Sequence, residues 1–468
     1  MESCVLVGKS RTEWFSLDEG LRQGCILSPV LFAIFIDGMA RVVKSARTRE
    51  ILKNLKLNIL LFADDALLFA SSPQELQFLL DLVFQYSGKW RFKFNIQKSK
   101  VMIFAGRKPT RRPSFYLGLQ KLEIVDSMKY LGVDFTAGWS WQSTKQRFAN
   151  KARARLACVG KAIYEGLTLE SGENLWRALV RPILEFACEI WGGGAWLEAE
   201  RIQLDAGRKL LGVGAKTTGE AVRGELGWWS LRGRRDLCRL RFFGKLARLG
   251  SDKLLKRVFL ICKPITGGMA TTWCGGTRKL LFDLGLGQVW RSENVGTSKD
   301  WEKVIYSSIK ARELQTWKQA MQKKEKLRLY RTIKSSLERE SYLVLPLETR
   351  RRLSEIRCGT HCLRIETGRW LKEAPEERFC RVCLCGSVED ELHALLECWQ
   401  YAELRKGMFL AIKAKSGFDV TLMVDDREWL RDFLIGVGPT KARSRLEVSR
   451  IVGTYFRKMF LRRETLLP

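Results

Sequence analysis

The sequence predicts an α+β fold in which a small mixed domain is followed by a longer, mostly helical region. Two apolar runs, 58–61 and 66–69, are separated by a short acidic segment, a pattern typical of a β-hairpin. Apolar residues at three- and four-residue spacing predict helices from 28 to 39 and from 73 to 92. From about residue 139 onward the pattern is helical. This order of elements is typical of an α+β domain with helical domains after it.

The two early helices have recognisable starts. Ser28-Pro29 predicts the first, because a hydroxyl N-cap is often followed by proline in the first helical turn. Ser72-Pro73 predicts the second in the same way. The residues from Lys98 to Phe104 are expected to form a further strand.

Asp64 and Asp65 follow Phe62-Ala63 at the tip of the predicted hairpin. Adjacent carboxylates repel each other, so a rigid turn that carries two of them is stabilised by a cation. Mg²⁺ is usually held by one or two carboxylates together with substrate phosphates. A solvated turn is the alternative, since Asp is a common turn residue, and the tetrapeptide alone favours that alternative.

The composition indicates a polyanionic partner. The chain has 468 residues, a net charge of +31, and 82 Lys and Arg against 51 Asp and Glu. This excess is too large for an ordinary soluble enzyme, so nucleic acid is the leading candidate and an anionic membrane surface the alternative. We expect no signal peptide and no membrane span, because the longest apolar stretch, 59–70, is interrupted by the two aspartates.

One predicted helix, 145–167, carries a basic stripe. Arg147, Lys151 and Arg155 recur at four-residue spacing on one face, and an apolar stripe follows another face. Like charges at this spacing destabilise an isolated helix. A nucleic acid bound beside these residues would explain their spacing. The alternative is a solvated helix face that needs no partner.

The thirteen cysteines are expected to be free thiols or metal ligands. Cys380 and Cys383 have the C-x2-C spacing of a zinc knuckle, and His393 and Cys398 complete a Cys₃His set, which is a standard structural zinc site. Cys385 could replace Cys383. A second group, Cys358, His361 and Cys362, lacks a fourth ligand and is read as buried thiols.

Four motifs in order carry a resemblance to a known family. They are G-L-R-Q-G-C-I-L-S-P from Gly20 to Pro29, F-A-D-D from Phe62 to Asp65, N-I-Q-K-S-K from Asn95 to Lys100, and Y-L-G from Tyr130 to Gly132. Together they closely resemble motifs B, C and D and the start of the thumb in reverse transcriptases of non-LTR (LINE-type) retrotransposons. The similarity continues more weakly from 181 to 191 and into the cysteine cluster, since such elements commonly end in a C-x2-C…H-x4-C module.

The resemblance implies an RNA-directed DNA polymerase that acts on an RNA template and a DNA primer or target, with dNTP as substrate. Asp64 and Asp65 would hold Mg²⁺ in a two-metal site. Lys98, or its neighbour Lys100, would lie near the departing pyrophosphate. The residues that the resemblance assigns to template or substrate binding are Arg22, Gln23, Gly24 and Phe62, and those that grip nucleic acid in the thumb are Arg147, Lys151 and Arg155.

The resemblance also implies what the chain lacks. Family members carry a third metal-binding aspartate, in motif A, upstream of the R-Q-G stretch, whereas only nineteen residues precede Gly20 here and none fits that motif. Asp18 and Asp37 stand in the wrong places. We therefore expect the C-terminal part of a longer element protein, inactive by itself. The alternative is a non-catalytic nucleic-acid-binding protein, either an element remnant or a co-opted one.

The predicted organisation follows from these readings. Residues 1–135 are expected to be a partial palm, 136–263 the helical thumb and connection, and 264–300 a Gly-rich linker. Residues 301–370 should form a basic helical region, and 371–468 the zinc module with C-terminal helices. By resemblance the protein would occur in nuclear and cytoplasmic ribonucleoprotein particles.

Overall fold

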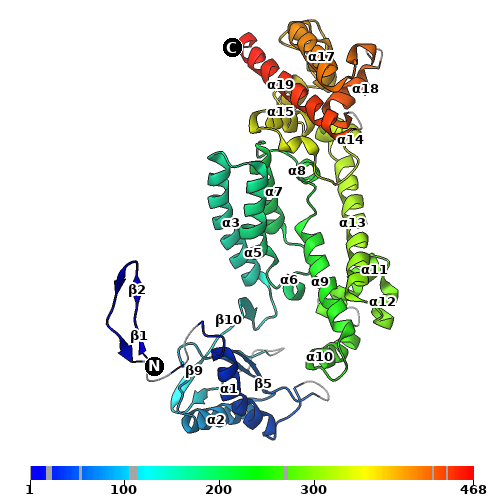
Figure 1. The fold of residues 1–468 in the computed structure, drawn as a ribbon. Helices are drawn as coiled ribbons and strands as arrows, with labels where there is room; N and C mark the ends of the chain where they lie inside the picture. The colour runs from blue at the N-terminus through cyan, green and yellow to red at the C-terminus, as the bar shows by residue number, and fades with distance from the viewer. Residues whose placement is uncertain are drawn as a thin grey trace. The chain divides into compact units, whose positions relative to one another are not determined.

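The computed structural model describes residues 2–16, 20, 24–51, 55–104, 113–266, 272–423, 426–438 and 441–467 (Figure 1). The chain packs as two units. The first contains Met1–Trp141 and Gly250–Ile265, and the second contains Gln142–Leu249 and Thr266–Pro468. Strands occur in the first unit and the second is helical, which is the predicted α+β class.

In its described residues, the first unit is built from short strands and three α-helices. β5 and β6 form an antiparallel hairpin, and β10 pairs with β11 in another. β9 lies between β7, to which it is parallel, and β8, to which it is antiparallel. Near the N-terminus, β1 pairs with β4 and β2 with β3. The bounds are β1 (Glu2–Ser3), β2 (Leu6–Val7), β3 (Ser10–Arg11), β4 (Phe15–Ser16), α1 (Ser28–Ser45), β5 (Ile59–Phe62), β6 (Asp65–Leu68), α2 (Pro73–Lys89), β7 (Lys100–Val101), β8 (Phe115–Leu117), β9 (Gln120–Ile124), β10 (Ser127–Tyr130), β11 (Val133–Thr136) and α10 (Leu254–Cys262).

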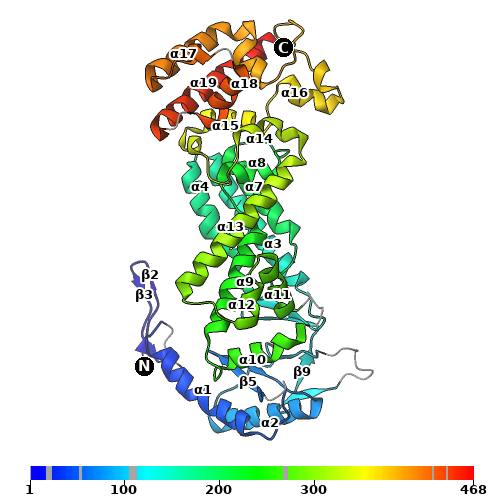
Figure 2. The same ribbon diagram turned by 90° about the vertical axis from the view of Figure 1, so that its right-hand side faces the viewer.

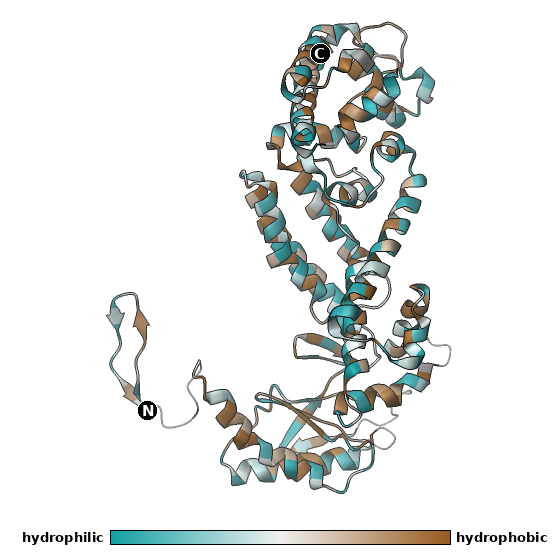
Figure 3. Ribbon diagram, turned by 45° about the vertical axis from the view of Figure 1, so that its right-hand side comes forward, coloured by the Kyte–Doolittle hydropathy of each residue, from teal (hydrophilic) through white to brown (hydrophobic). Residues whose placement is uncertain are grey.

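One apolar core joins α1, α2 and the three-stranded sheet. Val43 of α1, Leu79 of α2 and Phe115 of β8 are almost completely buried in it. The other face of α1 is also apolar but lies in solvent, where Ile34 is 70% exposed. In Figure 3, brown apolar residues recur along the helices of this unit.

The predicted helix starts are partly confirmed. Ser72 caps α2, because its hydroxyl accepts the backbone N–H of Glu75 at 3.2 Å. The first helix begins at Ser28 itself, with Leu27 in the N-cap position and no side-chain cap bond, so the predicted role of Ser28 as N-cap is wrong. The strand expected from Lys98 to Phe104 is reduced to the two residues of β7.

The second unit is an assembly of helices. α3 lies against α7, and α9 against α13, while α17 and α19 lie side by side (Figures 1 and 2). The bounds are α3 (Gln142–Tyr164), α4 (Leu169–Leu175), α5 (Arg181–Glu185), α6 (Cys188–Trp191), α7 (Leu197–Leu211), α8 (Gly219–Leu226), α9 (Leu231–Arg248), α11 (Trp273–Asp283), α12 (Gly287–Ser292), α13 (Ser298–Gln322), α14 (Arg328–Ile333), α15 (Leu347–Arg357), α16 (Arg364–Thr367), α17 (Ala402–Ser416), α18 (Arg427–Asp432) and α19 (Ala442–Leu466).

The segment from 264 to 300 differs from the predicted Gly-rich linker. It contains α11 and α12, and Leu281 and Trp290 are buried at 0% and 6% exposure. Thr272 caps α11 by accepting the N–H of Gly275 at 3.0 Å. Glycine content therefore misled the prediction, because several of these glycines lie inside or beside helices packed within the second unit.

A buried ion pair joins α8 to α15. The guanidinium of Arg357 donates to both carboxylate oxygens of Glu225 at 3.0–3.1 Å, and the two side chains are 1% and 0% exposed. Tyr342 donates its hydroxyl to the same carboxylate. Burial lowers the pKa of Arg357, but the charges of Glu225 and Glu340 outweigh it and raise that pKa well above its usual range. The helices around this pair are therefore held in one arrangement by a fully partnered charge.

Candidate functional site

The acidic dipeptide lies on a two-residue hairpin turn. Phe62 pairs directly with Asp65, which leaves Ala63 and Asp64 as the turn residues. Ala63 has a φ of +49°, the left-handed conformation that tight hairpins favour. Asp64 and Asp65 are exposed, and Phe62 is 61% exposed. The hairpin thus presents two adjacent carboxylates and an aromatic ring to solvent.

The carboxylates of the hairpin lack a further acidic neighbour in the described part of the chain. Two groups of metal-ligating side chains occur among the described residues, and neither includes Asp64 or Asp65. Asp37 forms an ion pair with Arg41 on α1 instead. Two carboxylates are an incomplete cage for Mg²⁺, which requires near-octahedral oxygen coordination.

Tyr130 of the Y-L-G motif lies within electrostatic reach of the hairpin. Burial, and after it the negative charge of Asp65, raise the pKa of Tyr130. Tyr130 ends β10 and Val133 begins β11, so this fourth motif also forms a tight turn within the first unit. Both motifs therefore form tight turns within the first unit.

The two lysines of the N-I-Q-K-S-K motif have different surroundings. Lys100 in β7 forms an ion pair with Glu123 in β9 at 2.6 Å. Lys98 is exposed on a turn whose backbone N–H groups are bound by Asn95. Of the two candidates, Lys98 is therefore the lysine that is available to a phosphate.

The R-Q-G motif is described only at its glycine. Gly24 has a φ of +86°, and a Cβ built on it would have open space around it. Such a backbone admits a close neighbour, as expected for a segment that contacts a ligand. Arg22 and Gln23 lie outside the described residues.

The predicted basic stripe lies on α3. The predicted apolar stripe is confirmed, since Phe148 and Leu156 are 4% and 3% exposed. Lys151 and Arg155 are exposed, and neither has an acidic partner among the described residues, whereas Arg147 lies with its guanidinium 4.6 Å from the Phe148 ring centroid. Unpaired cations on a regular helix face are available to phosphates.

Much of the remaining positive charge is neutralised internally. On α9, Arg234 pairs with Glu185 and Arg241 with Glu302. Arg235, 1% exposed, donates to the carbonyl of Gly192 at 3.2 Å. A dense run of arginines therefore does not by itself mark a nucleic-acid surface.

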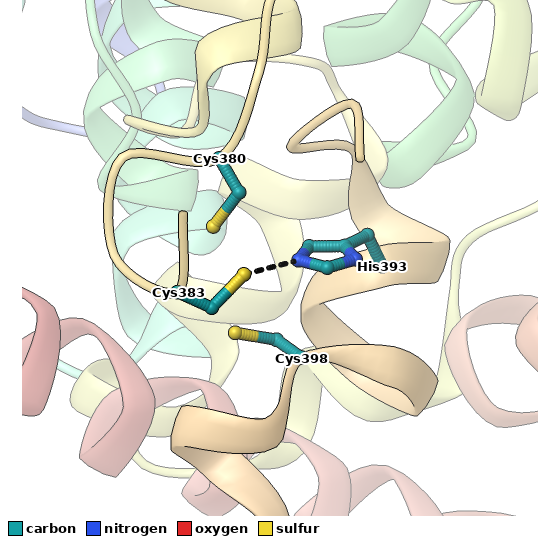
Figure 4. A group of neighbouring side chains, drawn as sticks. All are labelled: Cys380, Cys383, His393 and Cys398. Atoms are coloured by element: carbon teal, nitrogen blue, oxygen red, sulfur yellow. Dashed lines mark hydrogen bonds between the residues drawn. The ribbon is translucent and has the colours of Figure 1, made fainter. Parts of the chain in front are cut away.

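The four expected zinc ligands gather in the second unit (Figure 4). Cys380, Cys383, His393 and Cys398 are buried, and their ligand atoms lie within 4.8 Å of one another. The Cys383 sulfur is 3.4 Å from Nε2 of His393. Bond lengths to zinc of about 2.0–2.3 Å place tetrahedral ligand atoms about 3.3–3.8 Å apart, so this donor set fits the ion after a small contraction.

Local backbone geometry positions these ligands. Cys380 and Cys383 lie in one loop. Leu384, directly after Cys383, has a φ of +53°, and the N–H of Cys380 is bound by the carbonyl of Ser387 at 2.8 Å. His393 begins a π-helical turn, His393–Glu397, that ends at Cys398. The extra residue in such a turn places His393 and Cys398 on the same side. A hydrogen bond from the Cys398 thiol lowers the pKa of Cys380, which favours the thiolate that zinc requires.

The sequence reasoning missed the residues that orient His393. Its Nδ1 lies 3.4 Å from Glu397, and its backbone N–H is held by Asp390 at 2.8 Å. A carboxylate behind a histidine ligand fixes the ring and raises its basicity. The i, i+4 spacing of His393 and Glu397 was a sequence signal for this contact.

The two alternative cysteine groupings differ from the main group. Cys385 is exposed, with its sulfur 3.0 Å from that of Cys383, and lies outside the gathered set. In the second group, Cys358 is buried but Cys362 is exposed, and the His361 ring faces Glu391 at 3.0 Å instead of either thiol. The structure thus favours Cys383 and gives no metal group from Cys358, His361 and Cys362.

No helix in the described part of the chain is both long enough and apolar enough to cross a bilayer.

Comparisons with known proteins bear on the first unit. Residues 1–135 match the family model of the reverse transcriptase (RNA-dependent DNA polymerase). Over 134 residues the chain is 33% identical to the retrovirus-related Pol polyprotein from type-2 retrotransposable element R2DM of Drosophila melanogaster. The matched part is 27% of this chain, and the chain spans 13% of that relative's length. Residues 1–135 are therefore similar to reverse transcriptases, and the relative that they match comes from a retrotransposable element.

Proposed function

We propose that the chain is a retrotransposon-derived reverse-transcriptase segment that binds template and primer but does not extend a primer by itself. The observation that carries the proposal is the hairpin, with Asp64 and Asp65 exposed on one turn and no third ligand gathered beside them in the described residues. Asp64 and Asp65 would hold Mg²⁺ together with substrate phosphates, and the ion would stabilise charge on the reacting oxygens. Lys98, which is exposed, would bind a phosphate.

Two-metal catalysis requires ions about 3.5–4 Å apart, a spacing that ligands on both sides of the site maintain. Adjacent aspartates on one turn supply ligands from one side. With no third carboxylate gathered beside them in the described residues, positioning and charge stabilisation would both be weakened.

Primer extension on a homopolymer RNA template, with Mg²⁺ or Mn²⁺, tests this proposal. We expect no extension above that of an Asp64→Ala, Asp65→Ala double variant, while both proteins bind the template–primer in an anisotropy assay. Asp81→Ala, another acidic substitution in the first unit, serves as the matched control. Extension by the unmodified chain and by the control, lost in the double variant, would show a working polymerase.

Nucleic-acid binding by the second unit is the other part of the proposal. The unpaired Lys151 and Arg155 on α3 and the net charge of +31 support it. Zinc bound by Cys380, Cys383, His393 and Cys398 would cross-link the segment that contains these residues. The buried residues of this segment belong to the main hydrophobic core of the second unit.

A further inference from the structure

A cavity of about 410 Å³ lies within the second unit, and its lining residues include none of the basic stripe or the cysteine cluster. Residues of the segment 176–181, α7, α9 and α13 and of the turn at 227–229 line it. Its size is within the range of small-ligand sites. Its wall contains four arginines, three tryptophans and a tyrosine, and no carboxylate.

One of the four arginines of this cavity, Arg181, lacks a carboxylate of its own. The other three pair with acidic residues, Arg177 with Glu173, Arg234 with Glu185 and Arg241 with Glu302. Arg181 and Arg234 share one carboxylate, Glu185, which accepts from Arg234 at 3.1 Å but lies 3.7 Å from Arg181. The Nε of Arg181 is buried and has no hydrogen-bond partner. Burial, and then the charge of Arg234, lower the pKa of Arg181. An anion entering here would neutralise this excess and accept the free N–H.

The aromatic residues offer a stacking surface beside these cations. Trp229 and Tyr306 have ring centroids 4.8 Å apart and an interplanar angle of 39°, and Tyr306 is 48% exposed. Trp176 and Trp228 are already stacked on each other at 5.5 Å and 17°. The outer pair is therefore the one that retains an accessible ring face for a ligand.

A buried amide supplies an independent sign of a ligand. Gln203 is 2% exposed and lines the cavity, and its Nε2 donates to the carbonyl of Trp229 at 2.9 Å. Its Oε1 has no hydrogen-bond partner in the described structure. Buried polar atoms are nearly always paired. An N–H donor on a ligand in the cavity would complete this pairing.

We propose that the cavity binds one unpaired nucleotide, with its phosphate at Arg181, its base on Trp229 and Tyr306, and a base N–H on Gln203. An anion, an aromatic plane and an N–H donor meet in a nucleoside phosphate, and base stacking on aromatic side chains with arginine at the backbone is how single strands are bound. The inference rests on the proposed nucleic-acid binding and adds a preference for an unpaired nucleotide. The nucleotide would come from a single strand or from the free pool.

The test measures affinities of the full chain by fluorescence anisotropy for a single-stranded 12-mer and for a blunt duplex of the same sequence. Base–aromatic stacking predicts that Trp229→Ala and Tyr306→Ala each weaken single-strand binding about 5- to 150-fold. Duplex binding should change less than about twofold. Trp229→Phe should restore single-strand binding because it keeps a ring. Trp370→Ala, which removes another tryptophan of the second unit, 67% exposed, is the matched control.

Two further measurements complete the test. Photo-crosslinking of a 5-iodouracil-labelled 12-mer should label peptides containing Trp229 or Tyr306, and thermal melting should show that the variants fold. Competition by adenosine monophosphate supports the site and identifies the free nucleotide as its occupant, whereas labelling without competition supports a strand. Equal losses on single strand and duplex, or no loss in folded variants, overturn the cavity proposal. Failure of the unmodified chain to bind any nucleic acid instead overturns the proposed function.

Discussion

Replacing Arg357 by alanine is expected to loosen the contact between α8 and α15 by about 3–5 kcal/mol, the usual cost of removing one partner from a buried ion pair. The buried contacts of Arg357 support a loss of this size. Glu225 is 0% exposed, and the substitution removes the three Arg357 hydrogen bonds of 3.0–3.1 Å to its carboxylate, leaving the Tyr342 hydroxyl as donor. The same change removes the bond from Arg357 to the carbonyl of Ile435 at 2.9 Å.

The assay is hydrogen exchange followed by mass spectrometry, because a chain of two units need not unfold in one step. Peptides from α8 and α15 should exchange with a lower opening free energy by the amount above, while peptides from α2 in the first unit serve as an internal control. A double variant, Glu225→Gln with Arg357→Met, should lose less than Arg357→Ala, since it leaves no unpaired buried charge. A loss below about 1 kcal/mol for Arg357→Ala, or equal loosening of α2, would refute the reasoning.

Three further predictions concern the metal, the charge and the pH response. We expect elemental analysis to find about one zinc per chain in the unmodified protein and in Cys385→Ser, and none in His393→Ala. Zinc retained in His393→Ala, or absent from the unmodified protein, would contradict the assignment. Lys151→Gln with Arg155→Gln should reduce the slope of log K against log salt for duplex DNA by up to about 2, at about 0.9 per phosphate contact, and an unchanged slope in anisotropy titrations would exclude this stripe from the interface. Burial raises the pKa of Glu391, but the hydrogen bond from His361 and the charge of Arg328 outweigh it and lower that pKa to about 2, from 4.5. The ionised Glu391 therefore stabilises the folded state by about 3 kcal/mol above pH 4.5, and this stabilisation is lost as pH falls toward 2. The difference in unfolding free energy between pH 6 and pH 3 should be smaller in Glu391→Gln than in the unmodified protein. An identical difference would contradict the lowered pKa of Glu391.

The sequence by itself determined the elements whose causes are local. The apolar runs around Asp64 and Asp65 form the β5–β6 hairpin, and Ser72 caps α2, because turn and cap preferences depend on neighbouring residues alone. The spacing of Cys380 and Cys383 likewise led to the gathered ligand set, since a knuckle needs only a short loop. The order of the motifs was sufficient to indicate the family of residues 1–135.

Only the tertiary structure decided which basic residues form ion pairs and which glycine-containing segments form packed helices. Arg234 and Arg241 look alike in sequence to Lys151 and Arg155, yet the first two meet carboxylates from distant segments and the last two meet none in the described residues. The same holds for the segment 264–300, whose helices are stabilised by packing in the second unit despite their glycines. Ion pairing and burial depend on residues far apart in the chain, and local propensity contains no information about them.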